Sequence, residues 1–313
     1  MTQDRVALDV QHVSKTYAEV QAVDDLSFTV HPGEIFGLLG PNGAGKTTTI
    51  RMALDIIKPN SGEISVLGGP MTEEKKSRIG YLPEERGLYD DMKLLDTLLF
   101  LGQLKGLSGA TARDRAERYL KEVELWEARD RKIEALSQGM NQKAQFVAGT
   151  MHEPALLIID EPFSGLDPVN TRLIKTLLQR MRDEDTAIIM STHQMQRVEE
   201  MCERILLIDH GQRVLYGPLD EIRREFAANA VEVDLEGELN EVPGVERLSP
   251  RDGGYRMTLE EGVEPEAVLE TLVGMPEVTV ERFERVRTSL DDIFVQVVGR
   301  EVGSETEDEE ATP

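Results

Sequence analysis

A glycine-rich stretch that ends in lysine and threonine has the clearest chemical meaning in this sequence. It reads Gly40-Pro41-Asn42-Gly43-Ala44-Gly45-Lys46-Thr47, and Thr48 follows it. Glycines at this spacing let the backbone curl so that several N–H groups point inward at phosphate oxygens. The pattern predicts a phosphate-binding loop for a nucleotide, in which Lys46 reaches the β- and γ-phosphates and the Thr47 hydroxyl binds Mg²⁺.

The residues on either side of this loop support the prediction. Residues 35–39 form an apolar run that is typical of a buried strand, and residues 49–54 are typical of the start of a helix. The N-terminus of that helix would add partial positive charge where phosphates bind. A glycine-rich turn that binds nothing is the alternative interpretation, and the strand–loop–helix context disfavours it.

The larger, N-terminal part of the chain alternates strand patterns with helical ones. Strands are expected at residues 6–10, 23–30, 155–159 and 187–190, and a hairpin at 204–209 and 213–216. This alternation predicts an α/β domain, which we place at residues 1–220. Helical periodicity from about Leu94 to Glu127 predicts a helical insertion, at about residues 86–150, between the phosphate loop and the next buried strand.

The sequence changes character after Pro218. Short, half-polar strands are expected at residues 231–235, 255–259 and 278–283, and helices at 265–272 and 289–298. Residues 221–302 are therefore expected to form a small α+β accessory domain. Residues 303–313 have almost no apolar side chains and five acidic ones, which predicts a disordered acidic tail.

The charge of the chain limits its classes of partner. The formal net charge is −24, with 59 acidic residues against 35 basic ones. Such a surface repels nucleic-acid phosphates and an anionic membrane leaflet, so we expect no nucleic-acid partner and no direct membrane attachment. The scarcity of lysine among the basic residues favours a protein adapted to high salt over an ordinary acidic cytosolic protein.

Cysteine content and hydropathy both indicate the cytoplasm. Cys202 is the single cysteine, which excludes an internal disulfide and suits a reducing compartment. No stretch is apolar over the length that spans a bilayer, and residues 1–9 lack the apolar segment of a signal peptide.

Further motifs follow the phosphate loop in a fixed order. They are Leu136-Ser137-Gln138-Gly139-Met140, Asp160-Glu161 at the end of the apolar run, Ser164-Gly165-Leu166-Asp167, and Met190-Ser191-Thr192-His193. With the phosphate loop, this series resembles the ATP-binding-cassette family of transporter ATPases, in the type that carries an additional C-terminal domain. The resemblance covers residues 6–220 and, more weakly, the C-terminal region. It implies a P-loop NTPase fold with a helical subdomain, and ATP and Mg²⁺ as ligands.

The resemblance gives roles to an acidic pair and a histidine. Asp160 would hold the Mg²⁺ shell, and Glu161 would polarise the attacking water or accept its proton. His193 would be the switch histidine that contacts the γ-phosphate. An exposed acidic turn and a solvated histidine are the alternative interpretations, and the position of these residues just after apolar strands disfavours both.

Two further positions resemble contact residues of the family. Tyr17 matches the aromatic residue that stacks on adenine, since an aromatic face suits a flat base; a tyrosine of the core is the alternative. Residues 164–167 match the D-loop, which lies across the interface between two subunits.

Two motifs depart from the common form of the family. The common form of the signature motif is Leu-Ser-Gly-Gly-Gln, and this chain has glutamine at the third position and methionine at the fifth. Ser137 and Gly139, which would touch the γ-phosphate, are kept. A helix from Asn141 to Gly149 would aim its N-terminal charge at a phosphate on the opposite subunit. Glu84 stands where the family has a glutamine that senses the metal, so a charged oxygen replaces a neutral one; a solvated loop residue is the alternative.

The resemblance implies that one chain holds two half-sites. Ser137 and Gly139 would serve the ATP of another subunit, so a homodimer, or a dimer with a similar cassette, would close on two ATP molecules. The partner would be a transmembrane permease, of the export type, docked at the helical block 88–127. The chain would then lie at the inner face of the cell membrane through that permease.

Two other functions are compatible with a phosphate loop. A soluble cassette ATPase that acts on ribosomes or chromosomes is disfavoured because no second cassette and no long coiled coil is present. A nucleotide sensor that does not hydrolyse ATP is disfavoured by Glu161 and His193.

Overall fold

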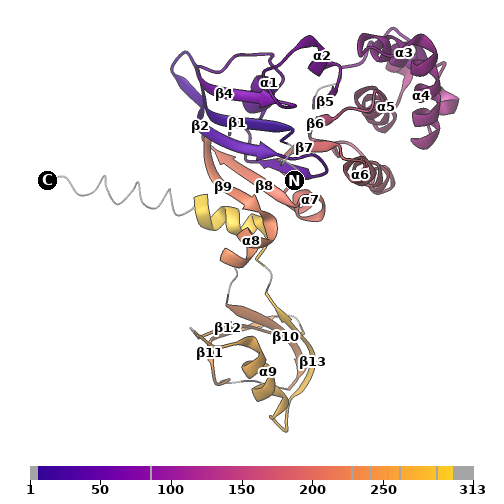
Figure 1. Cartoon of the computed structure of the whole chain (residues 1–313). Helices are drawn as coiled ribbons and strands as arrows, with labels where there is room; N and C mark the ends of the chain where they lie inside the picture. Colours follow the sequence, from indigo (N-terminus) through magenta and orange to yellow (C-terminus); the bar gives the residue numbers. More distant parts are fainter. Residues whose placement is uncertain are drawn as a thin grey trace, which may run out of the picture. The chain divides into compact units, whose positions relative to one another are not determined.

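The computed structural model describes residues 6–84, 87–226, 229–237, 239, 241–251, 253–260, 262–286 and 288–298. These residues fold as two compact units, one that ends at Leu219 and one that begins at Asp220. Figure 1 shows the helices and strands of both units.

A six-stranded sheet is the centre of the first unit. In spatial order its strands are β5 (Ile79–Leu82), β6 (Leu156–Asp160), β7 (Ala187–Thr192), β3 (Ile35–Leu39), β8 (Arg204–Asp209) and β9 (Gln212–Pro218). The first five are parallel, and β9 forms an antiparallel hairpin with β8. Every residue of β3, β6 and β7 is buried, which explains why these strands are near-continuous apolar runs.

A three-stranded antiparallel sheet packs against this centre. Its spatial order is β2 (Val20–Val30), β1 (Leu8–Tyr17) and β4 (Ser61–Val66). Both sheets contribute to one hydrophobic core, in which the Phe28 ring of β2 stacks on the Phe36 ring of β3 at 5.6 Å between centroids.

The strand expected at residues 6–10 is therefore too short. β1 runs on to Tyr17 through a mostly polar, partly exposed segment whose apolar alternation is broken by bulges. His12 and Asp25 sit at these bulges in left-handed conformations, with φ of 50° and 46°.

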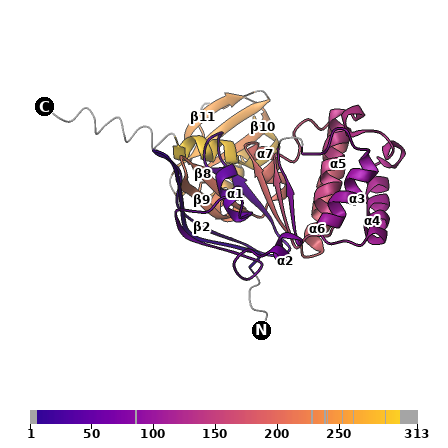
Figure 2. The same cartoon turned by 90° about the horizontal axis from the view of Figure 1, so that it is seen from above.

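The helices of the first unit fall into two groups. Those that flank the strands are α1 (Lys46–Ala53), α2 (Glu73–Lys76), α6 (Pro168–Asp183) and α7 (Met195–Met201). The helical insertion holds α3 (Leu94–Leu104), α4 (Gly109–Glu122), two 3₁₀ turns (Trp126–Ala128 and Ile133–Ala135) and α5 (Gln138–Thr150). Figure 2 shows α3, α4, α5 and α6 together at one side of the sheet, apart from α1.

Two helix boundaries differ from the sequence prediction. The stretch from Leu94 to Glu127 is divided by a turn, after which the Ser108 hydroxyl caps α4 by accepting the Thr111 N–H. The helix expected from Asn141 begins three residues earlier, at Gln138. None of the helices in the described part of the chain combines the length and the apolar character that a membrane span requires.

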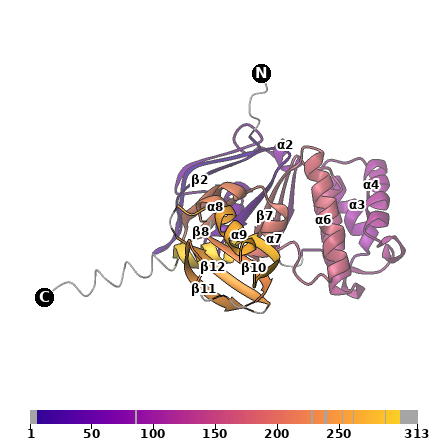
Figure 3. The same cartoon turned by 90° about the horizontal axis from the view of Figure 1, so that it is seen from below.

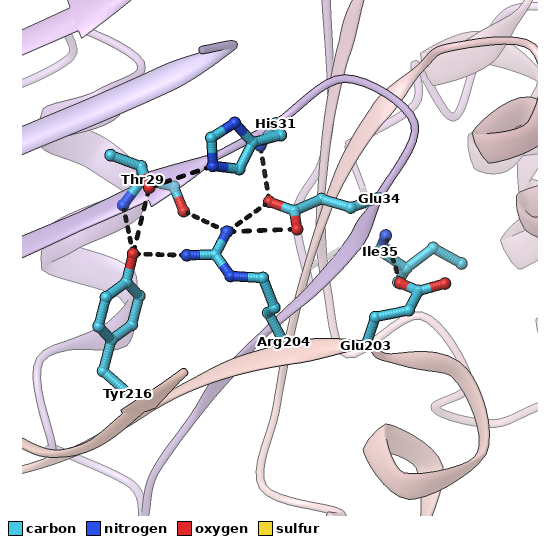
Figure 4. A network of polar contacts seen from close by, with 7 residues as sticks. All are labelled: Thr29, His31, Glu34, Ile35, Glu203, Arg204 and Tyr216. Atoms are coloured by element: carbon cyan, nitrogen blue, oxygen red, sulfur yellow. Dashed lines mark hydrogen bonds and ion pairs between the residues drawn. The ribbon is translucent and has the colours of Figure 1, made fainter. Parts of the chain in front are cut away.

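A polar network joins four strands at the N-terminal end of the parallel sheet (Figure 4). The Arg204 guanidinium, on β8, donates to Glu34 Oε1 at 3.0 Å and to the Thr29 carbonyl at 3.2 Å. It also donates to the Tyr216 hydroxyl at 2.6 Å, and its Cζ lies 5.7 Å from the Phe36 ring centroid. Arg204 and Glu34 are both largely buried, so the pair is shielded from water.

The second unit is an antiparallel sheet with a helix on one face. Its spatial order is β11 (Val245–Arg251), β12 (Gly254–Leu259), β10 (Ala230–Glu236) and β13 (Thr279–Arg285). α9 (Pro265–Val273) packs against this sheet (Figure 3), and a last helix covers residues 290–298. α8 (Leu219–Glu225) lies at the boundary between the two units.

The two faces of this second sheet differ in chemistry. Val231, Val233 and Met257 point into a core with Val268 and Leu272 of α9. The opposite face carries charged side chains, among them Glu232, Asp234, Arg256 and Arg282. The α+β fold expected for this region is confirmed, while residues 299–302 and the tail 303–313 lie outside the described residues.

Candidate functional site

The phosphate loop joins β3 to α1 and is held tightly by its neighbours. Gly40 has φ 148°, and a Cβ there would lie 2.1 Å from the Ile208 carbonyl oxygen. Gly45 has φ 110°, and a Cβ there would lie 2.5 Å from the Ala22 carbonyl oxygen. Only glycine fits at either position, so the backbone itself is the binding surface of the loop.

The first turn of α1 is open to an anion. Gly45 occupies the N-cap position, so no side chain caps the helix, and the first turn holds no acidic residue. The N–H groups of the first turn and the partial positive charge of the helix therefore face the loop. This geometry suits phosphate oxygens.

Lys46 is buried and bonded to its own loop. Its Nζ donates to the Gly40 carbonyl at 2.7 Å and to the Pro41 carbonyl at 3.0 Å. Burial lowers the pKa of Lys46, and the negative charges of Glu161, Asp160 and Glu84 oppose this shift.

Asp160 ends β6, at the same edge of the sheet as the phosphate loop. It is buried, and burial raises its pKa; the Ser191 side chain, which is in register with it on β7, partly offsets this shift. Among the described residues no lysine or arginine forms an ion pair with Asp160, and a buried carboxylate without such a partner favours a bound cation at this edge.

Glu161 has a strained backbone, and both of its carboxylate oxygens accept hydrogen bonds. It is buried at φ 50°, in the left-handed region that side chains other than glycine rarely adopt. Its Oε1 accepts the His193 backbone N–H at 3.0 Å and lies 2.6 Å from His193 Nδ1. Its Oε2 accepts the Thr192 hydroxyl at 2.9 Å. The carboxylate and the histidine are thus held together in this structure.

These groups share one cavity of about 200 Å³. Its walls are Ala22, Asn42, Gly43, Gly45, Lys46, Thr47, Thr48, Glu84, Asp160, Glu161 and His193. The structure therefore brings the phosphate loop, the acidic pair, Glu84 and His193 to one place, although they are far apart in the sequence. Gly40, Pro41 and Ala44, also predicted to bind nucleotide, support the loop and do not line the cavity.

The donors in the cavity fit Mg²⁺ in the presence of a nucleotide. Thr47, Asp160 and Glu84 offer the oxygen ligands that Mg²⁺ prefers. No group of three His, Cys, Asp or Glu side chains among the described residues is arranged to hold a metal by itself. A metal here would take its remaining ligands from phosphate and water, as Mg²⁺ commonly does.

Tyr17 is not among the residues that line the cavity. It is exposed at 44% and ends β1, where the β1–β2 hairpin pairs it with Val20. The Lys15 Nζ lies 5.4 Å from its ring centroid. Ala22, two residues beyond this hairpin pair, does line the cavity. An exposed ring at this place is available to a base, and the alternative of a core tyrosine is wrong.

Ser137 and Gly139 do not line this cavity. Ser137 is the N-cap of α5, and its hydroxyl accepts the Met140 N–H at 3.3 Å. Figure 1 places α5 in the helical part of the unit, apart from α1. The exposed start of α5 and the phosphate cavity are thus separate surfaces of one chain.

Gln138 contacts the loop of residues 164–167. Gly165 has φ 73°, and a Cβ there would lie 2.2 Å from Gln138 Nε2 and 2.8 Å from its Cδ. Asp167, at the end of this loop, caps α6 by accepting the Val169 and Asn170 N–H groups, each at 2.9 Å. The starts of α5 and α6 are therefore held side by side.

Two residues of the site were not predicted from the sequence. The Thr192 hydroxyl donates a hydrogen bond to Glu161. The sequence feature that could have identified Thr192 is its position directly before His193 in the same motif. Ala22 lines the cavity through the contact between β2 and the phosphate loop, for which a single alanine gives no sequence signal.

Comparisons with known proteins agree with this geometry. The family model described as ABC transporter matches residues 23–164, and the model described as ATP-binding protein DrrA1-3-like, C-terminal domain, matches residues 217–298. The uncharacterised ABC transporter ATP-binding protein YhaQ of Bacillus subtilis is 38% identical over 296 residues, which covers 93% of this chain and 98% of that protein.

Two further proteins are similar over most of their length. The Nod factor export ATP-binding protein I of Cupriavidus metallidurans is 33% identical over 303 residues, covering 94% of this chain and 98% of that protein. A solved structure of an ATP-binding subunit of an ABC transporter aligns with a TM-score of 0.67 at 33% identity, covering 70% of this chain and 93% of that one.

Proposed function

The chain belongs to the ATP-binding proteins of ABC transporters, an ATPase family, and we propose that two copies of it close on two ATP molecules to drive an export permease. Each ATP would be held by the cavity of one copy and covered by Ser137 and Gly139 of the other. Within this proposal, residues 1–220 are the cassette and residues 221–302 an accessory domain.

One observation carries the proposal. Lys46, Thr47, Asp160, Glu161 and His193 all line the cavity, whereas the exposed Ser137 and the half-buried Gly139 lie outside it, at the start of α5. In a single chain, therefore, the residues at the N-terminus of α5 do not reach the phosphate-binding cavity. Two chains arranged head to tail would complete both sites, and this arrangement supports a homodimer or a dimer with a similar cassette.

The side chains of the cavity suit phosphoryl transfer to water. Lys46 would exchange its two carbonyl partners for phosphate oxygens. Mg²⁺, held by Thr47, Asp160 and the phosphates, would neutralise charge on the transferred group. Glu161 would accept a proton from the water that attacks the γ-phosphorus, as the bond to the ADP oxygen breaks.

Glu161 must first change partners. Its two oxygens are engaged by Thr192 and His193 in this structure. If His193 turned toward the γ-phosphate, its ring would release Oε1 for the water. The ring–carboxylate contact would thus hold the base out of use until ATP is bound.

The permease would dock on the helical insertion. Tyr89, Phe100 and Leu104 are exposed there, and the Tyr89 and Phe100 rings meet edge to face at 5.8 Å between centroids. Such a contact would place the chain at the inner face of the cell membrane. Export is the direction that the similarity to the Nod factor export protein supports.

The Glu161→Gln variant tests the proposal. We expect ATP turnover to fall by at least ~100-fold, because the base for the attacking water is lost. We also expect ATP to hold this variant as a dimer, measured by light scattering at high salt, where a protein of net charge −24 repels itself least.

Ser137→Ala in the same background separates the two half-sites. It should weaken the ATP-dependent dimer while leaving nucleotide binding by the single chain intact. Turnover by Glu161→Gln at the native rate, or turnover that does not depend on protein concentration, would contradict the proposal.

A further inference from the structure

The nucleotide cavity contains more negative than positive charge. Three carboxylates line it, Glu84, Asp160 and Glu161, against the single cation of Lys46. All three act on Lys46 electrostatically, which places them within range of the phosphates that Lys46 would bind.

Lys46 does not neutralise any of these carboxylates directly. Its Nζ hydrogen bonds go to two backbone carbonyls, and no ion pair joins it to an acidic side chain in the part of the chain that the structure describes. The negative charge of the cavity therefore remains available to act on an incoming ligand.

Glu84 differs from the other two acidic residues. Asp160 and Glu161 are buried, and Glu161 is bonded by Thr192 and His193. Glu84 is exposed at the cavity wall, and its carboxylate has neither a hydrogen bond nor an ion pair with any described residue. Its charge therefore lies at the cavity wall without a hydrogen-bonded or ion-paired partner among the described residues.

Metal-free ATP and its Mg²⁺ complex meet this charge differently. Metal-free ATP carries more negative charge on its phosphates than the complex does, so a carboxylate beside the γ-phosphate repels it more. The complex also brings a cation that can accept the carboxylate as a direct or water-mediated ligand. A neutral amide at the same position would discriminate less, because it removes the repulsion and keeps an oxygen donor.

We propose that Glu84 makes this site select the Mg²⁺ complex of ATP against metal-free ATP. The inference rests on the proposed function, and it makes Glu84 a specificity-determining residue of the same cavity. A solvated loop residue with no influence on the ligand is the competing interpretation, and the exposure of Glu84 alone would fit it.

Equilibrium binding of AMP-PNP, an ATP analogue that is not hydrolysed, tests the proposal. Dissociation constants are measured by calorimetry for the full chain, with excess MgCl₂ or with EDTA at equal ionic strength. The informative quantity is the dissociation constant in EDTA divided by the dissociation constant in MgCl₂. This ratio is compared between the native chain and Glu84→Gln. Glu63→Gln is the matched control, since it removes the same charge from an exposed position on β4 that does not line the cavity.

We expect Glu84→Gln to lower the ratio by at least about threefold, mainly through tighter binding of the metal-free analogue. Glu63→Gln should leave the ratio at the native value, and added KCl should shrink the difference between the variants because salt screens exposed charges.

An equal ratio in the native chain and Glu84→Gln, or an equal change in both variants, would overturn the role of Glu84 alone. Failure of the native chain to bind the analogue in MgCl₂ would overturn the proposed function as well, so the two failures are distinguishable.

Discussion

The two ends of the parallel strands in the first unit differ in how their charged side chains are paired. At the N-terminal end, Arg204 and Glu34 are paired, and the remaining donors of the arginine reach the Thr29 carbonyl and the Tyr216 hydroxyl. At the C-terminal end, the hydrogen bonds of Lys46 to described residues go to two carbonyls, while three carboxylates line the same cavity.

This difference indicates which end stabilises the fold and which is prepared for a ligand. A buried charge with all its partners in place needs nothing further from solvent or ligand. A cavity with like charges and a left-handed glutamate stores unfavourable energy that a bound ligand can relieve. Stability and function are thus divided between the two ends of one sheet.

Arg204→Ala should have the largest effect on stability. Removing it leaves Glu34 largely buried without its cation and frees the Tyr216 hydroxyl. We expect a loss of about 3 kcal/mol in the free energy of unfolding, at the lower end for a broken buried pair because a fifth of the arginine side chain stays exposed. Urea denaturation measures this loss, and AMP-PNP affinity of the folded variant should not change.

Arg213→Ala is the control for this experiment. Arg213 lies beside the same tyrosine, with its Cζ 5.9 Å from the ring centroid, but has no ion pair among the described residues. A loss below about 1 kcal/mol is expected. Equal losses in the two variants would mean that the network is not what stabilises this end.

His152 should make stability fall in mild acid. It is buried near the start of β5, where its Nε2 lies 3.1 Å from the Ile79 carbonyl oxygen. Burial, aided by the nearby Lys105, lowers its pKa from 6.5 to about 4. Above pH 6.5, His152 is unprotonated in both the folded and the unfolded chain. As the pH falls from about 6.5 to 4, His152 gains the proton only in the unfolded chain, which costs about 3 kcal/mol of stability.

His152→Gln removes this proton-linked loss. The free energy of unfolding, measured at several pH values, should fall less steeply in the variant than in the native chain over that range. Parallel pH profiles for the two proteins would contradict the assignment, whatever the absolute stability of the variant.

Lys46→Ala should have the smallest effect on stability. The bonds of Lys46 to two carbonyls are offset by the cost of burying its charge, so we expect a change below about 1 kcal/mol in the free energy of unfolding. Affinity for AMP-PNP should nevertheless fall by at least ~100-fold, because the cation at the phosphates is lost. A loss of stability as large as that of Arg204→Ala would remove the contrast between the two ends.

The sequence predicted the ligand end better than the stabilising end. The phosphate loop is local: its glycines, Lys46 and Thr47 are contiguous, and its neighbours are a strand and a helix that the apolar pattern identifies. The acidic pair and His193 each follow an apolar strand, and the fold brings those strand ends together. Their catalytic roles remain predictions.

Long-range pairing explains what could not be predicted. Arg204 and Glu34 are 170 residues apart, and neither belongs to a pattern that selects the other. β4, β5 and β11 were missed because each is short or interrupted by glycine, proline or charged residues. Their pairing with longer strands, rather than their own propensity, makes them strands.

The contact between Gln138 and Gly165 links two sequence positions that look independent. The amide of Gln138 fills the space that a methyl group at position 165 would need, and the left-handed backbone there adds to the constraint. Protein engineers who restore the common glycine at position 138 would therefore open a small hole above residue 165. Libraries that vary these two sites together should recover pairs that single-site scans reject.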